Sequence, residues 1–376
     1  MMPNTNHNMI KLCRVILIGT IVPLLLFACS KTPQAGSFSP PYPGKATVVE
    51  SAAYSVTLQA SVTPISGSTA SLENLEFGFY FYPDSSPSSP SKATAHLNGK
   101  SFTATIEGLS TGITYTCTPY VRNGEFEVVG QSSEFTPANP FEDKTFWDYL
   151  IENFDRDKDG GLSKQEAESV TEITVPDMGI SSLGGIGLFP QLMHLYCQNN
   201  RLRKLDLSNN IYLTELVAER NMLEELDLRR NRELQTIVVW ENRLTNIDVT
   251  GLEMVGTFWC WMNRLNEIDI SSMKNLINFG CAQNAIKELD LSNNTNLINL
   301  APNHTLIEEL DLSHCPNLES LEIQGNNIVT EVDLTHCPKM RYMRSENCPN
   351  LRYIYINKGH SFAEIHKDDH TQLIEK

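Results

Sequence analysis

The chain has 376 residues, of which 41% are hydrophobic and 20% are charged. This length allows two to four domains of roughly 100 to 200 residues each. It excludes a very small domain that is held together only by disulfide bonds or a metal ion. Acidic residues outnumber basic ones by 45 to 29, which gives a formal net charge of −16. Because a nucleic-acid binder concentrates Lys and Arg against phosphates, this balance argues against nucleic acid as a partner.

The N-terminal segment has the features of a secretion signal. Lys11 and Arg14 precede an apolar run that is too short to span a bilayer comfortably. The run ends in Leu-Phe-Ala before Cys29, which resembles a lipobox, the signal at which bacteria acylate a cysteine and cleave before it. The resemblance implies a lipoprotein signal peptide over 1–28 and a lipid anchor on Cys29. An ordinary signal peptide that happens to carry a cysteine is the alternative.

The residue after Cys29 is Ser30 rather than Asp, which by resemblance to sorted lipoproteins implies the bacterial outer membrane. Acyl chains, and not charge, would then hold the chain to the membrane. Whether the anchored protein faces the cell surface or the periplasm is left open by the sequence. Residues 29–45 are rich in Ser, Thr, Pro and Gly and predict a semi-extended tether.

A small all-β sandwich is expected over 46–137, where β-branched and aromatic runs alternate with turn clusters. The runs that predict strands are 54–62, 75–82, 101–106, 113–121 and 126–135. Tyr115, Tyr120 and the closing Phe135-Thr-Pro resemble a fibronectin type III domain. The resemblance implies that the Tyr115 hydroxyl bonds to upstream backbone and that the domain serves as a spacer.

The middle of the chain has the spacing of a calcium-binding EF-hand loop, D-x-D-x-D-G-x-x-S-x-x-E. Its positions are filled by Asp155, Asp157, Asp159, Gly160, Ser163 and Glu166. Alternate carboxylates would surround the cation, Gly161 would offer its carbonyl, and Glu166 would close the site with both oxygens.

An apolar face at Phe146, Leu150 and Phe154 predicts a helix before this loop, and residues 164–173 can form the helix after it. The sequence contains no second loop of this kind, so we expect a structural calcium and not a sensor. The alternative is a capping box between Ser163 and Glu166, with the aspartates in a solvated turn.

From Leu192 onward the chain repeats with a period of 21 residues, which lengthens to 22 near the end. Five apolar columns follow the repeat, and one of them runs Leu202, Leu223, Leu244, Leu265, Ile286, Ile307, Ile328 and Leu351. The unit is that of a leucine-rich repeat, which predicts a parallel-β solenoid over 191–357. We expect residues 141–190 to form its helical N-terminal cap and 358–376 an exposed C-terminal cap or tail.

Cys197, Cys260 and Cys281 share one inward column and are expected to be small core residues. Asn200, Asn221, Asn242, Asn263, Asn284 and Asn326 form a column in which a buried amide can satisfy backbone groups at the bend. These cysteine-bearing units resemble the cysteine-ladder branch of the internalin-like bacterial surface proteins over about residues 141–376. The resemblance implies a binding role, commonly adhesion, without naming a ligand.

Residues flanking the inward column point outward on the predicted sheet, and three of the four tryptophans gather there. The expected ligand-binding residues are Tyr196, Glu219, Trp240, Glu241, Trp259, Trp261 and Met262. An exposed apolar patch rimmed by acids suits a protein hot spot or a sugar ring. The alternative is that loops or the sandwich cover these rings as intramolecular packing.

An aspartate recurs once per turn from Asp206 to Asp333. Each carboxylate can accept a hydrogen bond from the backbone or from a Ser or Thr side chain two residues later, and we prefer this structural explanation to a row of cation-binding sites. His366 and His370 are expected in an exposed charged end and not in a metal site. The sequence shows no recognisable catalytic motif, so an enzyme is not expected.

The leading hypothesis is therefore a monomeric, lipid-anchored binding protein of the cell envelope that recognises a protein or a glycan. A periplasmic scaffold or assembly protein is the alternative, and a glycan-utilisation accessory is a third possibility that depends only on the tryptophans.

Overall fold

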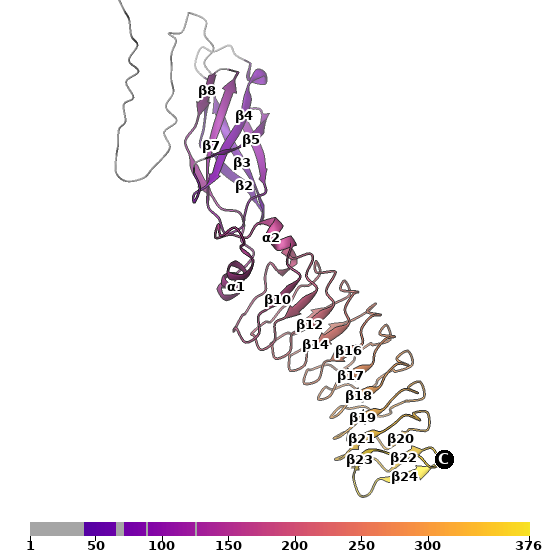
Figure 1. Cartoon of the computed structure of the whole chain (residues 1–376). Helices are drawn as coiled ribbons and strands as arrows, with labels where there is room; N and C mark the ends of the chain where they lie inside the picture. Colours follow the sequence, from indigo (N-terminus) through magenta and orange to yellow (C-terminus); the bar gives the residue numbers. More distant parts are fainter. Residues whose placement is uncertain (1–40, 65–70, 88, 125) are drawn as a thin grey trace, which may run out of the picture.

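The computed structural model describes residues 41–64, 71–87, 89–124 and 126–376. The expected signal peptide, Cys29 and most of the tether lie outside these residues. Within the described part of the chain, no helix is both long and apolar enough to cross a membrane. Figure 1 shows a strand-rich N-terminal region, a short helical segment and a row of stacked coils that runs to the C terminus.

The N-terminal region is built from antiparallel strands around its own apolar core. In β3 the residues alternate between buried and half-buried positions, with Val56, Leu58 and Ala60 pointing inward. Phe79 packs on Phe102 across this core, with ring centroids 5.3 Å apart. The elements are β1 (Tyr42–Pro43), β2 (Thr47–Ser51), β3 (Ser55–Thr63), η1 (Leu72–Asn74), β4 (Glu76–Pro83), β5 (Ser91–Asn98), β6 (Ser101–Glu107), β7 (Tyr115–Asn123), β8 (Phe126–Val129) and β9 (Ser133–Phe135).

Strand β5 was not among the strands expected from the sequence. It pairs with β4 on one side and with β6 on the other, in the order β1-β3-β6-β5-β4-β7-β8. Only Ala95 of its eight residues is buried. A strand with so few apolar residues carries almost no hydrophobic signal, and its position is set by its two neighbours.

Two short helices follow this N-terminal β-domain. Helix α1 (Lys144–Phe154) begins at Asp143, whose side chain accepts hydrogen bonds from the backbone of Thr145 and Phe146. Helix α2 (Lys164–Glu168) is shorter than the helix expected over 164–173. Ile173 instead lies in β10 (Glu172–Thr174) and pairs with Leu195 in a parallel ladder, because this buries its side chain at the start of the solenoid.

The repeats form one continuous parallel ladder in the order β10-β11-β12-β14-β16-β17-β18-β19-β21-β23. Leu195, Leu216 and Ile237 lie opposite one another in successive strands, so a period of 21 residues advances the chain by one strand. After η2 (Ile186–Leu188), the strands of this ladder are β11 (His194–Tyr196), β12 (Glu215–Val217), β14 (Thr236–Val238), β16 (Thr257–Trp259), β17 (Asn278–Gly280), β18 (Asn299–Ala301), β19 (Ser320–Glu322), β21 (Tyr342–Ser345) and β23 (Glu364–Lys367).

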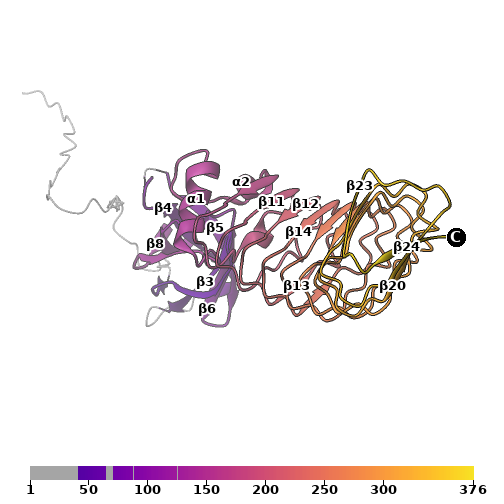
Figure 2. The same cartoon turned by 90° about the horizontal axis from the view of Figure 1, so that it is seen from below.

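Shorter ladders lie on a second side of the coils, where Figure 2 separates β13 and β20 from the main row of strands. They consist of β13 (Glu225–Asp227) with β15 (Asn246–Asp248), and β20 (Glu331–Asp333) with β22 (Tyr353–Ile356) and β24 (Gln372–Glu375). One apolar core runs from Phe141 to Ile356 between the two sides. The expected parallel-β leucine-rich repeat solenoid is confirmed.

One position of the expected apolar columns is wrong. Ile328 is 38% exposed, while Val329 is 1% exposed and takes the inward place. The extra residue of this longer repeat lies between Asn326 and Val332, both of which are buried. In the earlier turns the inward residue follows the column asparagine by two positions, whereas in this longer repeat it follows by three. The column was continued with the shorter spacing and therefore included Ile328 in place of Val329.

The C-terminal residues 358–376, expected as an exposed cap or tail, form one more turn of the solenoid. Strand β23 pairs with β21 and β24 pairs with β22. Asp368 accepts hydrogen bonds from the backbone N–H groups of Asn347 and Cys348, at 3.0 and 2.7 Å. Its carboxylate thus replaces the asparagine amide of the earlier turns as acceptor at this bend.

Candidate functional site

The outward face of the main ladder displays the residues on either side of each buried strand centre. In β16 the ring of Phe258 is buried, and Thr257 and Trp259 are half-buried on the opposite face. Trp240 and Trp261 follow strands β14 and β16 and still belong to the ladder. Their carbonyls accept hydrogen bonds from the backbone N–H groups of Arg220 and Glu241 in the preceding turns, each at 3.0 Å.

The three tryptophans of this face form one cluster. Trp240 stacks on Trp261 with ring centroids 5.7 Å apart and planes 26° apart. Trp259 lies 5.1 Å from Trp261 at an angle of 50°. A Cβ on Gly280 would lie 2.7 Å from Trp259 Cε3, so the ring of Trp259 rests directly on the backbone of the next turn. All three side chains are half-buried by one another and by the ladder.

A basic side chain that the sequence did not single out closes one side of the cluster. The guanidinium carbon of Arg220 lies 4.6 Å from the centroid of the Trp240 ring. Arg220 Nε donates to Glu241 Oε2 at 2.9 Å, so the carboxylate holds the cation over the ring. Arg220 precedes Glu241 by one repeat, and this spacing is the signal that could have revealed the pair.

Met262 and Glu241 belong to a column whose backbone is left-handed. Their φ angles are 55° and 53°, and Arg220 of the preceding turn has 53°. The left-handed turn after each strand tips these side chains to the edge of the face, where Met262 is 42% exposed. The structure therefore brings Trp240, Trp259, Trp261, Met262 and Glu241 together as expected.

Tyr196 lies on the same face, nearer its N-terminal end. Its hydroxyl donates to Glu215 Oε2 at 2.8 Å. Along the ladder, the position of Tyr196 in β11 is taken by Val217 in β12 and by Val238 in β14 before Trp259 occupies it in β16. The structure thus places Tyr196 on the expected face but outside the tryptophan cluster.

Glu219 follows strand β12 and lies one turn before Trp240 on this face. Its backbone carbonyl accepts a hydrogen bond from Asn199 N at 3.0 Å, as expected for a residue that continues the ladder. Burial raises the pKa of its carboxyl, whose Oε2 is shielded from solvent and has no hydrogen-bond partner among the described residues. Glu219 is therefore at the N-terminal border of the cluster, as predicted.

Beyond the tryptophans the outward side chains become small and then polar. Ala282 follows Trp261 in the ladder register, and Asn303 follows Ala282. Asn303 Nδ2 donates to Glu322 Oε2 at 3.2 Å and to Gln324 Oε1 at 2.9 Å. The face therefore changes from aromatic rings to a hydrogen-bonded group of amides and one carboxylate within two turns.

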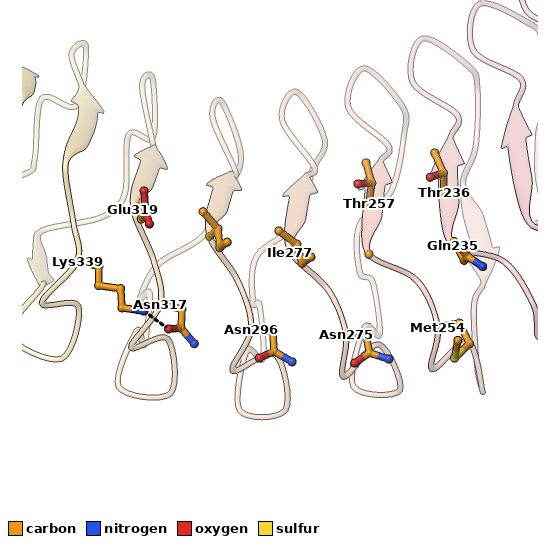
Figure 3. A pocket seen from close by; sticks show the side chains of 12 residues that line it. Gln235, Thr236, Met254, Thr257, Asn275, Ile277, Asn296, Asn317, Glu319 and Lys339 are labelled. Atoms are coloured by element: carbon orange, nitrogen blue, oxygen red, sulfur yellow. Dashed lines mark hydrogen bonds between the residues drawn. The ribbon is translucent and has the colours of Figure 1, made fainter.

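A shallow groove runs along the edge of the ladder beside this face (Figure 3). Asn275, Asn296 and Asn317 line it, and their amide groups donate to backbone carbonyls 22 residues earlier, at 2.9 to 3.0 Å. Lys339 Nζ donates to Asn317 Oδ1 at 2.7 Å, shown as the dashed line in Figure 3. Hydrogen bonds between turns account for these amides, so the groove follows from the repeat itself.

The three aspartates of the predicted calcium loop point toward one another. Oxygen atoms of Asp155, Asp157 and Asp159 lie within 4.8 Å of one another. Asp155 Oδ1 is shielded from solvent and has no hydrogen-bond partner among the described residues. Burial and the neighbouring carboxylates raise the pKa of Asp157. Gly160 turns the chain here with a φ of 88°, so the carboxylates and the turn fit a divalent cation.

Ser163 and Glu166 have a structural role in this loop. They form a capping box at the start of α2, the arrangement considered as the alternative to metal binding. Glu166 Oε1 also accepts a hydrogen bond from Arg156 N at 2.7 Å. The Glu166 carboxylate therefore stabilises the loop backbone in this conformation and would have to turn to reach a cation.

The loop is attached to the N-terminal β-domain by a short β-bridge. Thr111 and Leu162 exchange two backbone hydrogen bonds of 3.0 and 3.1 Å. Ser110 Oγ donates to Asp159 Oδ2 at 3.2 Å, and Ser110 N donates to Tyr115 Oη at 2.9 Å. The sequence predicted the Tyr115 bond, but nothing in the sequence indicated that the same corner would touch the acidic loop.

The recurring aspartates have a structural role. Each accepts a hydrogen bond from the backbone N–H two residues later, at 2.9 to 3.1 Å. These bonds help to hold the pKa of most of these carboxyls below its ordinary value, as in Asp290, where the Ser292 N–H is the largest cause. The column consists of Asp206, Asp227, Asp248, Asp269, Asp290, Asp311 and Asp333.

The cysteines of the described chain are free and buried. Cys260 and Cys281 lie in neighbouring turns with no exposed surface. Burial raises the pKa of Cys281 to about 12, which keeps the thiol protonated and unreactive. These residues act as small core side chains, as expected from their inward column.

No protein-family model matches the sequence. No curated protein matches it either. Similar solved structures are leucine-rich repeat proteins. The functional domain of InlJ from Listeria monocytogenes, which includes a cysteine ladder, is 24% identical with a TM-score of 0.40, covering 56% of this chain and 61% of that one.

Internalin C2 from Listeria monocytogenes is 21% identical with a TM-score of 0.41, covering 50% of this chain and 86% of its own. YopM, a leucine-rich effector protein from Yersinia pestis, is 21% identical with a TM-score of 0.41, covering 59% of this chain and 63% of its own. This chain thus spans less than two thirds of the InlJ domain. Because these structural similarities are low, the leucine-rich repeat fold is established by the strand register of the chain itself and not by the comparisons.

Proposed function

We propose that this chain is a lipid-anchored binding protein of the bacterial cell envelope, with an adhesin-like role. The observation that carries the proposal is the cluster of Trp240, Trp259 and Trp261 on the outward face of the ladder. Half-buried aromatic rings with an exposed methionine at their edge are typical of binding hot spots. A protein is the proposed partner, because an open face many strands long presents a broad surface rather than an enclosed pocket.

The remaining parts of the proposal concern how the face is presented. Cys29 would carry the lipid anchor on the outer membrane, and the fibronectin type III-like sandwich would act as a spacer. The acidic loop would hold one structural calcium through Asp155, Asp157 and Asp159. Because Ser110 and Thr111 of the sandwich contact this loop, a bound cation would stiffen the junction between the sandwich and the solenoid.

Site-specific photocrosslinking tests the binding face. A photoreactive amino acid at position 262, beside the tryptophans, is expected to capture a discrete partner on cells that express the full chain. The matched control is position 211, because Ile211 is 46% exposed and Met262 is 42% exposed. Capture at 262 that disappears in Trp259→Ala/Trp261→Ala supports the face, whereas equal capture from both positions would refute it.

Calorimetry with calcium chloride tests the cation site. The wild-type chain is expected to release or absorb heat with one-site stoichiometry, and Asp155→Ala is expected to lose that signal. Asp206→Ala removes an acid whose hydrogen bond to Ser208 N already explains it, so this variant should bind calcium as the wild type does. Flat isotherms for the wild type would remove calcium from the proposal.

A further inference from the structure

The acidic loop lies directly against a corner of the N-terminal β-domain. Thr111 is fully buried at this corner, and Ser110 is 8% exposed. A Cβ on Gly161 would lie 2.6 Å from Ile113 Cγ1 and 2.8 Å from Thr111 O, so the loop backbone and the corner leave no space for a side chain at this position. Together with the two backbone hydrogen bonds between Thr111 and Leu162, this contact shields one side of the loop from solvent.

Ser110 holds a hydroxyl group against the loop carboxylates. Its Oγ donates to Asp159 Oδ2 at 3.2 Å, and its backbone N–H donates to Tyr115 Oη at 2.9 Å. The second bond fixes the residue, because the ring of Tyr115 is buried. A hydroxyl group has two acceptor lone pairs besides its proton, and no described residue donates to Ser110 Oγ. This oxygen can therefore bind a cation while it continues to donate to Asp159.

The loop itself offers few free oxygens to a calcium ion, which takes about six to eight. Both oxygens of Glu166 are committed, because Oε1 accepts from Arg156 N at 2.7 Å and Oε2 accepts from Ser163 N at 2.8 Å. Asp155 Oδ1 is shielded from solvent and has no hydrogen-bond partner among the described residues. An oxygen from outside the loop would help to complete the set of ligands, and Ser110 presents one.

We propose that Ser110 is a ligand of the calcium site, so that the cation is shared between the N-terminal β-domain and the loop. This inference rests on the calcium ion of the proposed function and adds a ligand that the loop motif does not contain. Calcium binds oxygens at about 2.3 to 2.6 Å, which leaves neighbouring ligand oxygens roughly 3 Å apart. The 3.2 Å between Ser110 Oγ and Asp159 Oδ2 matches this spacing. The hydroxyl would bind as a neutral group, and the carboxylates would balance the charge of the cation.

A shared ligand links cation binding to the contact between the two domains. When the corner separates from the loop, the site loses the Ser110 oxygen and the cation binds less tightly. By the same linkage, a bound cation stabilises the docked arrangement. The backbone N–H of Thr111 donates to Leu162 O at 3.0 Å and belongs to the β-domain, so its hydrogen exchange reports this docking.

Terbium luminescence tests the ligand directly, because terbium takes the same oxygen ligands as calcium and each bound water shortens its emission lifetime. In the full chain, Ser110→Ala is expected to hold about one bound water more than the wild type, since water replaces the lost hydroxyl. Calorimetry with calcium chloride is expected to show roughly tenfold weaker binding in this variant. Ser110→Cys keeps the size of the side chain but replaces the oxygen by sulfur, a poor ligand for these cations, and should behave like Ser110→Ala. Ser110→Thr keeps the hydroxyl and should retain the wild-type values.

Ser133→Ala is the matched control. Ser133 also lies in the β-domain, and its hydroxyl donates to Ala46 O at 3.1 Å. This variant should change neither the number of bound waters nor the calcium affinity, and circular dichroism checks that each variant is folded. Hydrogen exchange adds a measure of docking, since calcium should slow exchange of the Thr111 amide in the wild type and slow it less in Ser110→Ala.

Unchanged hydration and affinity in both Ser110→Ala and Ser110→Cys would overturn the inference, and the calcium site of the proposed function would stand. Weaker binding without an additional bound water would give Ser110 a structural role only, which also contradicts the inference. A wild-type chain that binds neither terbium nor calcium would remove the cation from both proposals. The binding face does not depend on these outcomes, because crosslinking from position 262 tests it separately.

Discussion

The asparagine column makes a sharp prediction about stability, because each amide connects three pieces of backbone. Asn284 is 6% exposed. Its Nδ2 donates to the carbonyls of Cys260 and Cys281 at 3.0 Å each, and its Oδ1 accepts from Leu265 N at 2.9 Å. Asn284→Ala therefore leaves one backbone donor and two acceptors without this partner.

A buried backbone group without a partner costs about 1 to 3 kcal/mol, so we expect Asn284→Ala to lower the free energy of unfolding by about 3 kcal/mol. Asn293→Ala is the matched control, because Asn293 is exposed, and it should change stability by less than about 0.5 kcal/mol. Urea titration followed by far-ultraviolet circular dichroism measures both variants.

Hydrogen exchange locates the effect, since the Leu265 amide should lose protection in Asn284→Ala before amides of distant turns do. Asn284→Asp sharpens the test. Its carboxylate can accept from Leu265 N but would face two carbonyl oxygens, so it should be destabilising at neutral pH and less so in acid. Stability of Asn284→Ala within about 0.5 kcal/mol of the wild type would refute the role given to the column.

Three further predictions concern other parts of the chain. Gly280→Ala should displace the ring of Trp259, because the new Cβ would lie 2.7 Å from it, and should shift tryptophan fluorescence and weaken crosslinking from position 262. Tyr115→Phe should cost about 1 kcal/mol in thermal or chemical unfolding, because its hydroxyl accepts a backbone hydrogen bond at 2.9 Å. Arg229 is the largest cause that lowers the pKa of Asp227 from 3.8 to about 2, so this carboxylate favours the folded state above pH 3.8 and loses that effect as the pH falls toward 2. Titration of Arg229→Ala by nuclear magnetic resonance should show the pKa of Asp227 raised toward its ordinary value but still below it, because the backbone N–H of residue 229 keeps its hydrogen bond to this carboxylate. An unchanged pKa would contradict the role of the Arg229 side chain.

The solenoid could be predicted from the sequence because every turn repeats one pattern of buried side chains. Leu195, Leu216 and Ile237 occupy equivalent strand centres, and an error in one turn does not affect the others. The exceptions arise where the pattern changes. Ile328 was misplaced because its repeat gains a residue, and the last turn was missed because Asp368 replaces the asparagine.

The binding face was predictable in part for the same reason. Alternation along a strand places Trp259 and Trp261 on the side opposite to Cys260. The position of Arg220 over Trp240 depends on a left-handed backbone turn, which only the three-dimensional structure displays. The bridge from Thr111 to Leu162 joins residues that are distant in sequence and share no repeat, so no local pattern encodes it.

We infer that the three tryptophans form a binding face and are not part of the apolar core. The most direct measurement compares thermal unfolding and crosslinking from position 262 in the full chain and in the variant Trp240→Ala/Trp259→Ala/Trp261→Ala. Crosslinking is expected to disappear while the melting temperature falls by only a few degrees, since the rings are half-buried on the surface of the solenoid. Crosslinking that persists, or a collapse of the melting temperature, would contradict it.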